Sequence, residues 1–215
     1  MSKSTMGTKE IILNQSLKMF NERGIEYVGL REIAAELDIR VSNITYYFPT
    51  KDDLVFELSS ELTKLNASVI VVREELTLYA FLEMLHRVFQ HHIQYRCLLL
   101  SFVHLVQQNK KVADAYKKTQ ALRSSSFKAN LEVLAKAGYI NISSDEDLQF
   151  LVSTLALISR FWISEAAISF RKWSVADQMD HYLHLIAKLV HSYATAKGKK
   201  EIRSFFDNFN SARLF

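Results

Sequence analysis

Proline, glycine and cysteine are all scarce in this sequence. Its 215 residues include one proline and five glycines. Folds rich in β-structure need many turns, and these two residues serve most turns, so their scarcity favours long helices. The single cysteine, Cys97, excludes an intrachain disulfide and fits a reducing cytoplasm. It lies in an apolar run, where a small core residue is expected rather than a redox sensor.

The signatures of common catalytic sites are also missing. The sequence contains no Gly-rich phosphate loop, no G-x-S-x-G and no H-E-x-x-H. Two groups of histidines lack the carboxylates or cysteines that would complete a metal site: His86, His91, His92 and His104, and His181, His184 and His191. We therefore predict no enzyme, no catalytic residue, no metal site and no cofactor.

No part of the chain is expected to enter a membrane. The N-terminal residues are polar and show no apolar signal segment. Residues 151–170 are long and apolar enough to span a bilayer, but they include Arg160, Glu165 and four serines. A cytoplasmic location is expected.

The distribution of charge along the chain does not identify a binding partner. The formal net charge of +4 invites a nucleic-acid interpretation. Residues 1–55, however, contain seven Lys/Arg and eight Asp/Glu, a balance of −1. Apolar residues make up 49% of the chain and charged residues 23%, which is typical of a soluble globular protein.

Apolar residues recur with helical spacing along nearly the whole chain. The sequence predicts an all-α fold with a small N-terminal domain in residues 1–55 and a larger helical domain in residues 56–215. A continuous helix from Asp52 to about Val71 joins the two domains, and such a rod could transmit motion between them. The run 95–108 is apolar almost all round, which indicates burial within the helical body.

The segment 30–54 organises the N-terminal domain. Its first helix places apolar residues on one face, namely Leu30, Ile33, Ala34 and Leu37. Asp38 follows, a residue that tolerates the left-handed backbone of a helix end. A second helix is expected over Val41–Tyr47, with Ile44 and Phe48 facing inward, and Pro49 ends it. Two helices joined by so short a turn form a helix-turn-helix, and Thr50 with Asp53 makes a capping box for the next helix.

The outward side of the second helix carries groups that could contact DNA. Short polar side chains near a helix N-terminus can enter a major groove and bond base edges. Tyrosine hydroxyls and a lysine at a helix start suit phosphate oxygens. The outward residues are Arg40, Val41, Ser42, Asn43, Thr45, Tyr46 and Tyr47. The alternative is a solvated helix that never touches DNA, because the motif also occurs in other proteins.

The segment resembles the DNA-binding domain of the tetracycline-repressor (TetR) family of transcriptional regulators. In that family an Ile-Ala pair is followed by a short turn. A run then ends in Tyr or His, an aromatic residue and Phe, followed by either Pro or Lys, a small residue and Lys, with a Leu further along. The matching residues are Ile33, Ala34, Ile39, Ile44, Tyr46, Tyr47, Phe48, Pro49, Thr50, Lys51 and Leu54. The resemblance implies that DNA is contacted by Arg31, Ser42, Asn43, Tyr46, Tyr47 and Lys51.

Four positions depart from the family pattern. The family usually has glycine where Asp38 stands and a capping serine or threonine where Arg40 stands. It often has tyrosine in place of Thr45 and threonine near Leu30. These positions lie on or beside the expected reading helix, so they bear on the operator sequence more than on the fold.

The C-terminal domain carries two further expectations. Helices at about 144–173 and 175–196 have wide apolar faces and begin with the capping boxes Ser144/Asp147 and Ser174/Asp177. These two helices carry more apolar surface than the core of a single subunit needs. Each subunit is therefore expected to give two helices to a four-helix homodimer seam, as the resemblance also implies. Some ring residues could line a ligand pocket, although such residues are often ordinary core: Phe89, Tyr95, Phe102, Phe127, Phe161 and Trp162.

With the resemblance, the sequence predicts a transcriptional repressor that binds palindromic double-stranded DNA as a homodimer. The resemblance alone implies release of the DNA by a small, largely apolar ligand of unknown identity. Two alternatives stay open. One is a small-molecule-binding helical protein or enzyme that does not use DNA. The other is a helical interaction protein that uses the motif for packing.

Overall fold

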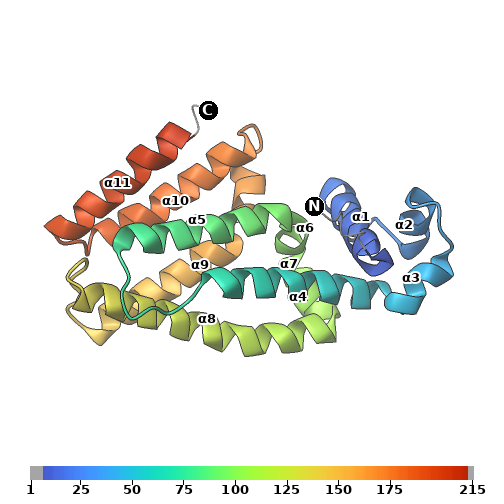
Figure 1. Cartoon of the computed structure of the whole chain (residues 1–215), viewed down its shortest axis with the longest axis horizontal. Coiled ribbons are helices and arrows are strands. Elements are labelled where there is room, and N and C mark those ends of the chain that lie inside the picture. Colours follow the sequence, from blue (N-terminus) through green and yellow to red (C-terminus); the bar gives the residue numbers. More distant parts are fainter. Residues whose placement is uncertain (1–6, 213–215) are drawn as a thin grey trace, which may run out of the picture. The chain divides into compact units, whose positions relative to one another are not determined.

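The computed structural model describes residues 7–212, with side chains described to residue 209, and it is helical nearly throughout (Figure 1). No β-strand occurs in that part of the chain, so the predicted all-α class is confirmed. The helices are α1 (Thr8–Arg23), α2 (Leu30–Glu36), α3 (Val41–Tyr47), α4 (Lys51–Val69), α5 (Leu78–Gln94), α6 (Arg96–Leu100), α7 (Phe102–Gln108), α8 (Lys110–Lys136), α9 (Asp145–Ser169), α10 (Val175–His191) and α11 (Ala196–Ala212).

Local side-chain chemistry fixes where these helices begin and end. Asp38 adopts a φ of 52° after α2, which confirms the predicted left-handed turn. Thr50 and Asp53 form the predicted capping box, since the Asp53 N–H donates to Thr50 Oγ1 and the Thr50 N–H donates to Asp53 Oδ2, both at 3.1 Å. The Ser144 and Ser174 hydroxyls cap α9 and α10 in the same way, each accepting from an N–H three residues later.

Four predicted helix bounds need correction. The run 95–108 is two helices, because Ser101 between α6 and α7 has a non-helical backbone with ψ of 10°. α4 ends at Val69 and α9 at Ser169, both earlier than predicted. The helix expected over 175–196 ends at His191 because the chain beyond it pairs with another loop: the Thr195 N–H donates to the Tyr139 carbonyl, 3.0 Å away.

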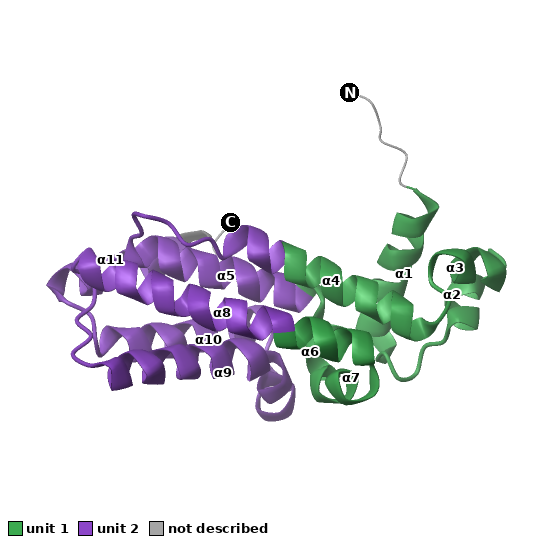
Figure 2. Ribbon diagram, turned by 90° about the horizontal axis from the view of Figure 1, so that it is seen from below, with its two compact units in different colours: residues 1–64, 94–117 green, residues 65–93, 118–215 purple. Residues whose placement is uncertain are grey.

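The chain forms two compact units, shown in green and purple in Figure 2. Unit 1 comprises residues up to 64 together with 94–117, and unit 2 comprises 65–93 with 118–215. The expected domain division after residue 55 stays a prediction.

Unit 1 contains α1, α2 and α3, which pack on one another. Their shared core is fully buried and includes Ile12, Phe20, Ile33, Ala34, Ile44 and Phe48. Asn21 links α1 to α6, because its Oδ1 accepts the Cys97 N–H at 3.0 Å and its carbonyl accepts from the Arg96 guanidinium at 3.0 Å. The three-helix motif is therefore held both by its own apolar core and by polar bonds to the later helices of its unit.

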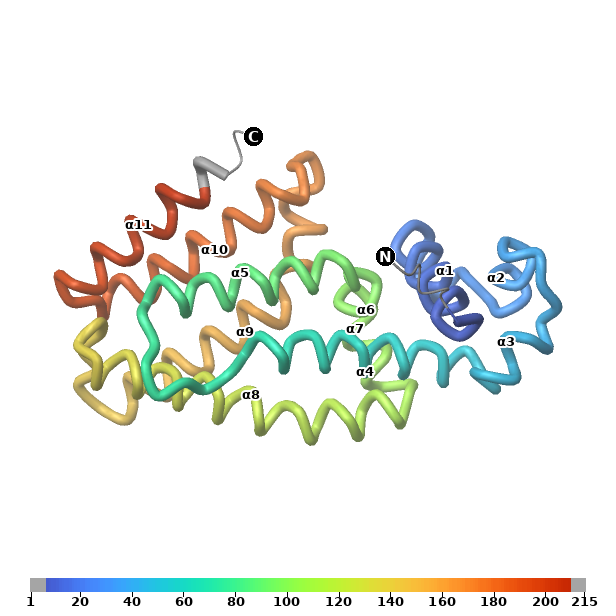
Figure 3. The backbone as a smooth tube through the Cα atoms, viewed as in Figure 1, coloured from blue at the N-terminus to red at the C-terminus, as the bar shows by residue number. Residues whose placement is uncertain are grey.

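Unit 2 contains α5, α9, α10, α11 and most of α8. α9, α10 and α11 follow one another in alternating directions, and each packs on the next (Figure 3). The ring of Trp162 on α9 stacks on Phe89 of α5, with centroids 4.6 Å apart. Both side chains are almost completely buried, so this stack lies within the core of the unit.

Gly198 on α11 provides a first test of this packing. A Cβ at this position would overlap the carbonyl oxygen of Tyr139, which already accepts the Thr195 N–H. Gly198→Ala should therefore lower the free energy of unfolding by about 1–3 kcal/mol. Helix propensity alone would instead raise the free energy of unfolding by up to about 1 kcal/mol, so the sign of the change distinguishes the two effects. Urea denaturation measures it, with Lys199→Ala, at the exposed neighbouring position of α11, as the control.

Candidate functional site

The short helix α3 is anchored by its inward face. Ile44 is 0% and Phe48 2% exposed, as the sequence predicts. Asp38 turns the chain just before the helix, and Phe48 takes an extended conformation just after it, ahead of Pro49. With its apolar side fixed in the core, α3 can present its other side to a partner.

The outward face of α3 is polar and exposed. Ser42, Asn43 and both tyrosines lie on the surface, and Tyr46 is 81% exposed. The Tyr46 and Tyr47 rings meet edge to face with centroids 5.0 Å apart, which limits the freedom of both hydroxyl groups. This face combines small hydrogen-bonding groups near the helix start with two phenol groups near its end.

Three of the predicted contact residues are less accessible. Val41 and Thr45 are half-buried, and the Thr45 hydroxyl donates to the Ser42 carbonyl at 3.4 Å. Lys51 is half-buried with its Nζ 6.0 Å from the centre of the Phe20 ring. Burial lowers the pKa of Lys51, while the charges of nearby carboxylates oppose the shift.

Two arginines flank this helix on the surface. Arg31 is exposed on α2, and Arg40 is exposed at the N-cap of α3. The Arg40 side chain makes no capping bond to the helix, which agrees with its replacing a capping serine or threonine. Arg40 thus stands at the start of α3 itself, whereas Arg31 belongs to the preceding helix.

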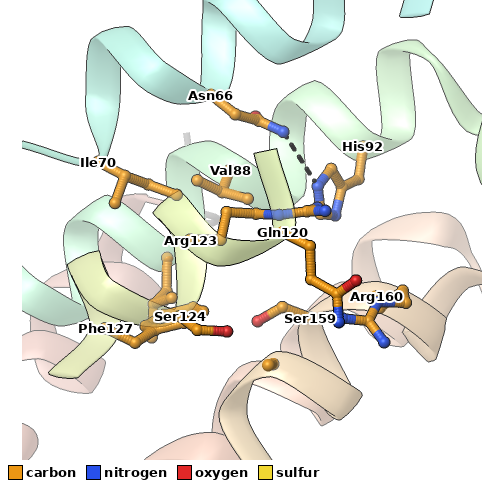
Figure 4. Close-up of a pocket in the computed structure, with 12 residues that line it drawn as sticks. Asn66, Ile70, Val88, His92, Gln120, Arg123, Ser124, Phe127, Ser159 and Arg160 are labelled. Carbon is orange, nitrogen blue, oxygen red and sulfur yellow. Dashed lines mark hydrogen bonds between the residues drawn. The ribbon is translucent and has the colours of Figure 1, made fainter. Parts of the chain in front are cut away.

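Unit 2 contains a small cavity of about 40 Å³. Its apolar lining comes from α5, α8, α9 and the turn after α4, and comprises Ile70, Leu85, Val88, Phe127 and Ala156. Its polar lining includes Asn66, His92, Gln120, Arg123, Ser124 and Arg160, with Ser159 beside them (Figure 4). A volume of this size accommodates roughly three water molecules.

A chain of hydrogen bonds crosses one wall of this cavity. The Trp162 indole donates to Nδ1 of His92 over 3.2 Å. The neutral His92 ring then carries its proton on Nε2. The Asn66 Nδ2 lies 3.3 Å from this nitrogen, so the amide has to turn over, with its oxygen toward the N–H, in order to accept from it. The Asn66 Oδ1 lies 3.1 Å from Nδ1 of His91. Burial, with the charge of Arg123, lowers the pKa of His92 to about 3, so this ring stays neutral near pH 7.

Comparison with known families decides what kind of protein this is. Residues 12–58 match the family model described as bacterial regulatory proteins of the tetR family. Residues 63–202, well over half of the chain, match the TetR model described as a bacterial transcriptional repressor. The chain belongs to the TetR family of transcriptional regulators. The predicted family and the helix-turn-helix type are thereby confirmed.

Individual relatives of this TetR-family protein agree with that assignment. The HTH-type transcriptional regulator YttP of Bacillus subtilis is 38% identical over 56 residues, which are 26% of this chain and 27% of YttP. A TetR-family regulator from Marinobacter aquaeolei has a similar fold, with a TM-score of 0.86 at 21% identity over 95% of this chain and 99% of its own. A transcriptional regulator from Saccharomonospora viridis, solved with choline, has a TM-score of 0.66 at 20% identity over 83% of this chain and 94% of its own.

The predicted pocket residues of this TetR-family protein fall into different places. Phe127 lines the cavity, while Phe89 and Trp162 form the stacked pair beside it. Tyr95 and Phe102 belong to unit 1, where the Tyr95 hydroxyl donates to Glu61 over 3.2 Å. Phe161 is half-buried on α9. The set predicted from the sequence is thus brought together only in part.

The polar lining of the cavity was not predicted. Asn66, Gln120, Arg123 and Ser159 are ordinary helix residues by sequence alone, and nothing in their spacing marks them. Arg160 did offer a signal, because a charged residue within an apolar helix is expensive to bury and is often functional. The described part of the chain contains no group of three or more His, Cys, Asp or Glu that could hold a metal ion.

Proposed function

We propose that this TetR-family regulator is a cytoplasmic repressor that binds a palindromic operator as a homodimer and is released from it by a small molecule. The observation that carries the proposal is the two-sided helix α3, with Ile44 and Phe48 fully buried and Ser42, Asn43 and Tyr46 exposed. A reading helix needs that arrangement, because only a rigidly seated helix can hold side chains in register with base edges.

The proposed contacts divide by chemistry. Ser42 and Asn43 lie in the first turn of α3, where they would reach base edges in the major groove. Tyr46 and Tyr47, with Lys51 at the start of α4, would bind phosphate oxygens. Arg31 and Arg40, both exposed, would add positive charge near the DNA. Lys51 would move away from the Phe20 ring on binding, while Val41 and Thr45 would make close apolar or indirect contacts.

Asn43 provides the sharpest test of direct base recognition. Asn43→Ala should weaken operator binding by about 1–3 kcal/mol and relax the preference at one base position. Lys51→Ala should instead weaken binding to all duplexes alike. Selection from a random duplex pool measures both effects, and Asn14→Ala, an exposed asparagine on α1, serves as the control. An Asn43→Ala protein with the original sequence preference would contradict the assignment of α3 as the base-reading helix.

An apolar stripe on α9 supports the proposed homodimer. Phe150, Leu157 and Ile168 are 52%, 57% and 72% exposed, and their spacing of seven and eleven residues corresponds to about two and about three helical turns. Within the described chain α9 is the one helix that could cross a membrane by length and composition, yet only 28% of its most apolar window is buried. A second copy packing through α9 and α10 would cover this stripe.

Dimerisation and operator symmetry belong together in this proposal. Two copies of α3 related by a two-fold axis would read half-sites about 34–36 Å apart, or a multiple of that distance, so the operator would be a palindrome. α4 begins shortly after α3. Its last turn contains Asn66, and Ile70 follows it directly; both residues line the unit 2 cavity. A ligand in that cavity could therefore act on the helix that carries the reading head.

A salt titration tests the DNA-binding step directly. Affinity for a random duplex should fall linearly with salt concentration on a double-logarithmic scale, because each phosphate contact releases condensed counterions. A helical carrier or enzyme that does not use DNA should show no such affinity. Selection of bound duplexes from a random pool then tests whether the preferred sites are palindromic.

A further inference from the structure

A buried asparagine stands at the corner between α7 and α8. Asn109 is 3% exposed, and its Oδ1 accepts the Val112 N–H at 3.1 Å, which caps the start of α8. Its Nδ2 donates to the Asp52 carbonyl in the first turn of α4, 3.0 Å away. One side chain thus caps its own helix and holds the start of a helix 57 residues earlier in the chain.

An ion pair joins the same two helix starts. The Lys111 ammonium group donates to Oδ1 of Asp53. The other oxygen, Oδ2, accepts from the Thr50 hydroxyl at 2.8 Å and from the Thr50 N–H at 3.1 Å, so the Asp53 carboxylate closes the capping box and binds α8 at the same time. The hydrogen bond from Lys111, together with that from Thr50, holds the pKa of Asp53 below its ordinary value, so this carboxylate is ionised near pH 7.

These contacts lie next to a proposed DNA contact. Lys51 is the first residue of α4 and directly precedes Asp52 and Asp53. Only residues 48–50 separate it from the end of α3, and three residues span at most about 11 Å. All of these residues belong to unit 1, green in Figure 2. Holding the first turn of α4 therefore also limits where Lys51 and the end of α3 can lie.

We propose that Asn109 and Lys111 are positioning residues for DNA binding, which hold the first turn of α4 so that Lys51 meets a phosphate group while α3 lies in the groove. The contacts of these two residues with Asp52 and Asp53 are here named the α4 latch. Without the latch, only a fraction of the molecules have the start of α4 correctly placed, and the apparent affinity falls by that fraction. The inference rests on the proposed function, because it takes Lys51 as a phosphate contact.

Asn109→Ser separates the latch from the helix cap. Serine is a good N-cap residue, so the start of α8 keeps its bond, whereas the shorter side chain does not reach the Asp52 carbonyl. Circular dichroism should show the original helix content. Affinity for a duplex selected from a random pool, measured by fluorescence anisotropy, should fall by roughly three- to tenfold, the factor that one hydrogen bond contributes. The base preference should not change, in contrast to Asn43→Ala, because phosphate contacts carry no sequence information.

The ion pair gives a test in which the direction of one effect decides. Lys111→Met removes a positive charge, and Asp53→Asn removes a negative charge beside Lys51 while its amide oxygen can still accept from Thr50. Bulk charge alone would make the first variant bind duplex more weakly and the second more tightly, and the double variant would match the original. The latch predicts that each single variant binds roughly two- to fivefold more weakly, and that the double variant is no weaker than either.

Lys110→Met is the matched control for Lys111→Met. It removes the same charge from the neighbouring exposed position, but the Lys110 ammonium group pairs with Asp114 of its own helix, 2.6 Å away. Its affinity should fall by less than about twofold, because salt screens an exposed charge that makes no contact with α4. Equal losses for Lys110→Met and Lys111→Met would contradict the latch, as would tighter duplex binding by the Asp53→Asn protein.

Two further outcomes separate the latch from the proposed function. If the original protein binds duplex and both Asn109→Ser and Lys111→Met bind it equally well, the latch is refuted and the regulator stands. If the original protein binds no duplex even at low salt, the proposed function is refuted and the latch with it.

Discussion

Leu157→Glu is expected to convert the proposed dimer into monomers and to lower operator affinity by about a hundred- to ten-thousandfold. Leu157 lies in the middle of the exposed apolar stripe on α9, between Phe150 and Ile168. A carboxylate there would have to be buried without a partner when two subunits pack, and its symmetry mate would add a second like charge. Loss of the dimer removes the advantage of binding two half-sites at once, which accounts for the expected factor.

Leu122→Glu is the matched control for this change. Leu122 on α8 is 65% exposed, so it is as accessible as Leu157 but lies outside the proposed seam. Sedimentation velocity gives the oligomeric state, and a duplex-binding titration gives the affinity. If the Leu157→Glu protein sediments as the original does and keeps its operator affinity, α9 is not the dimer seam.

Trp162→Ala should lower the free energy of unfolding by about 3–5 kcal/mol, a large part of the stability of a typical domain. The side chain is 2% exposed and stacks on Phe89 at an interplanar angle of 14°. Its removal leaves a cavity in the core of unit 2 and also leaves Nδ1 of His92 without its donor. Both effects act in the same direction.

Urea denaturation followed by circular dichroism measures this change, and Trp173→Ala is the control. Trp173 is 46% exposed, so its truncation should cost much less. Trp162→Phe should fall between the two, because it keeps a ring against Phe89 but removes the N–H and part of the indole volume. A Trp162→Ala protein as stable as the Trp173→Ala protein would contradict the packing described for unit 2.

Local signals made the helix-turn-helix predictable. The bounds of α3, the left-handed backbone at Asp38 and the Thr50/Asp53 capping box all depend on residues close together in the sequence. Helix starts at Ser144 and Ser174 were predictable for the same reason, since each serine caps an N–H three residues along. The inward direction of Ile44 and Phe48 follows from helical periodicity alone.

Contacts between distant segments were not predictable from these signals. The cavity joins Asn66, His92, Arg123 and Arg160, which come from four different helices. Periodicity shows which face of a helix is apolar but not which other helix covers it, so the sequence points to ring residues and not to the polar residues that line the cavity. The early end of α10 likewise depends on pairing between residues near Ala194 and Ile140. The predicted DNA contacts themselves stay predictions until binding is measured.

The hydrogen bond from Trp162 to His92 has a fixed polarity. An indole can give a hydrogen but has no lone pair in the ring plane with which to receive one, so this donor and this acceptor cannot exchange roles. The far nitrogen of the imidazole must therefore always point a hydrogen outward. A group that pairs with this nitrogen has to bring a lone pair, which an alkylammonium group lacks.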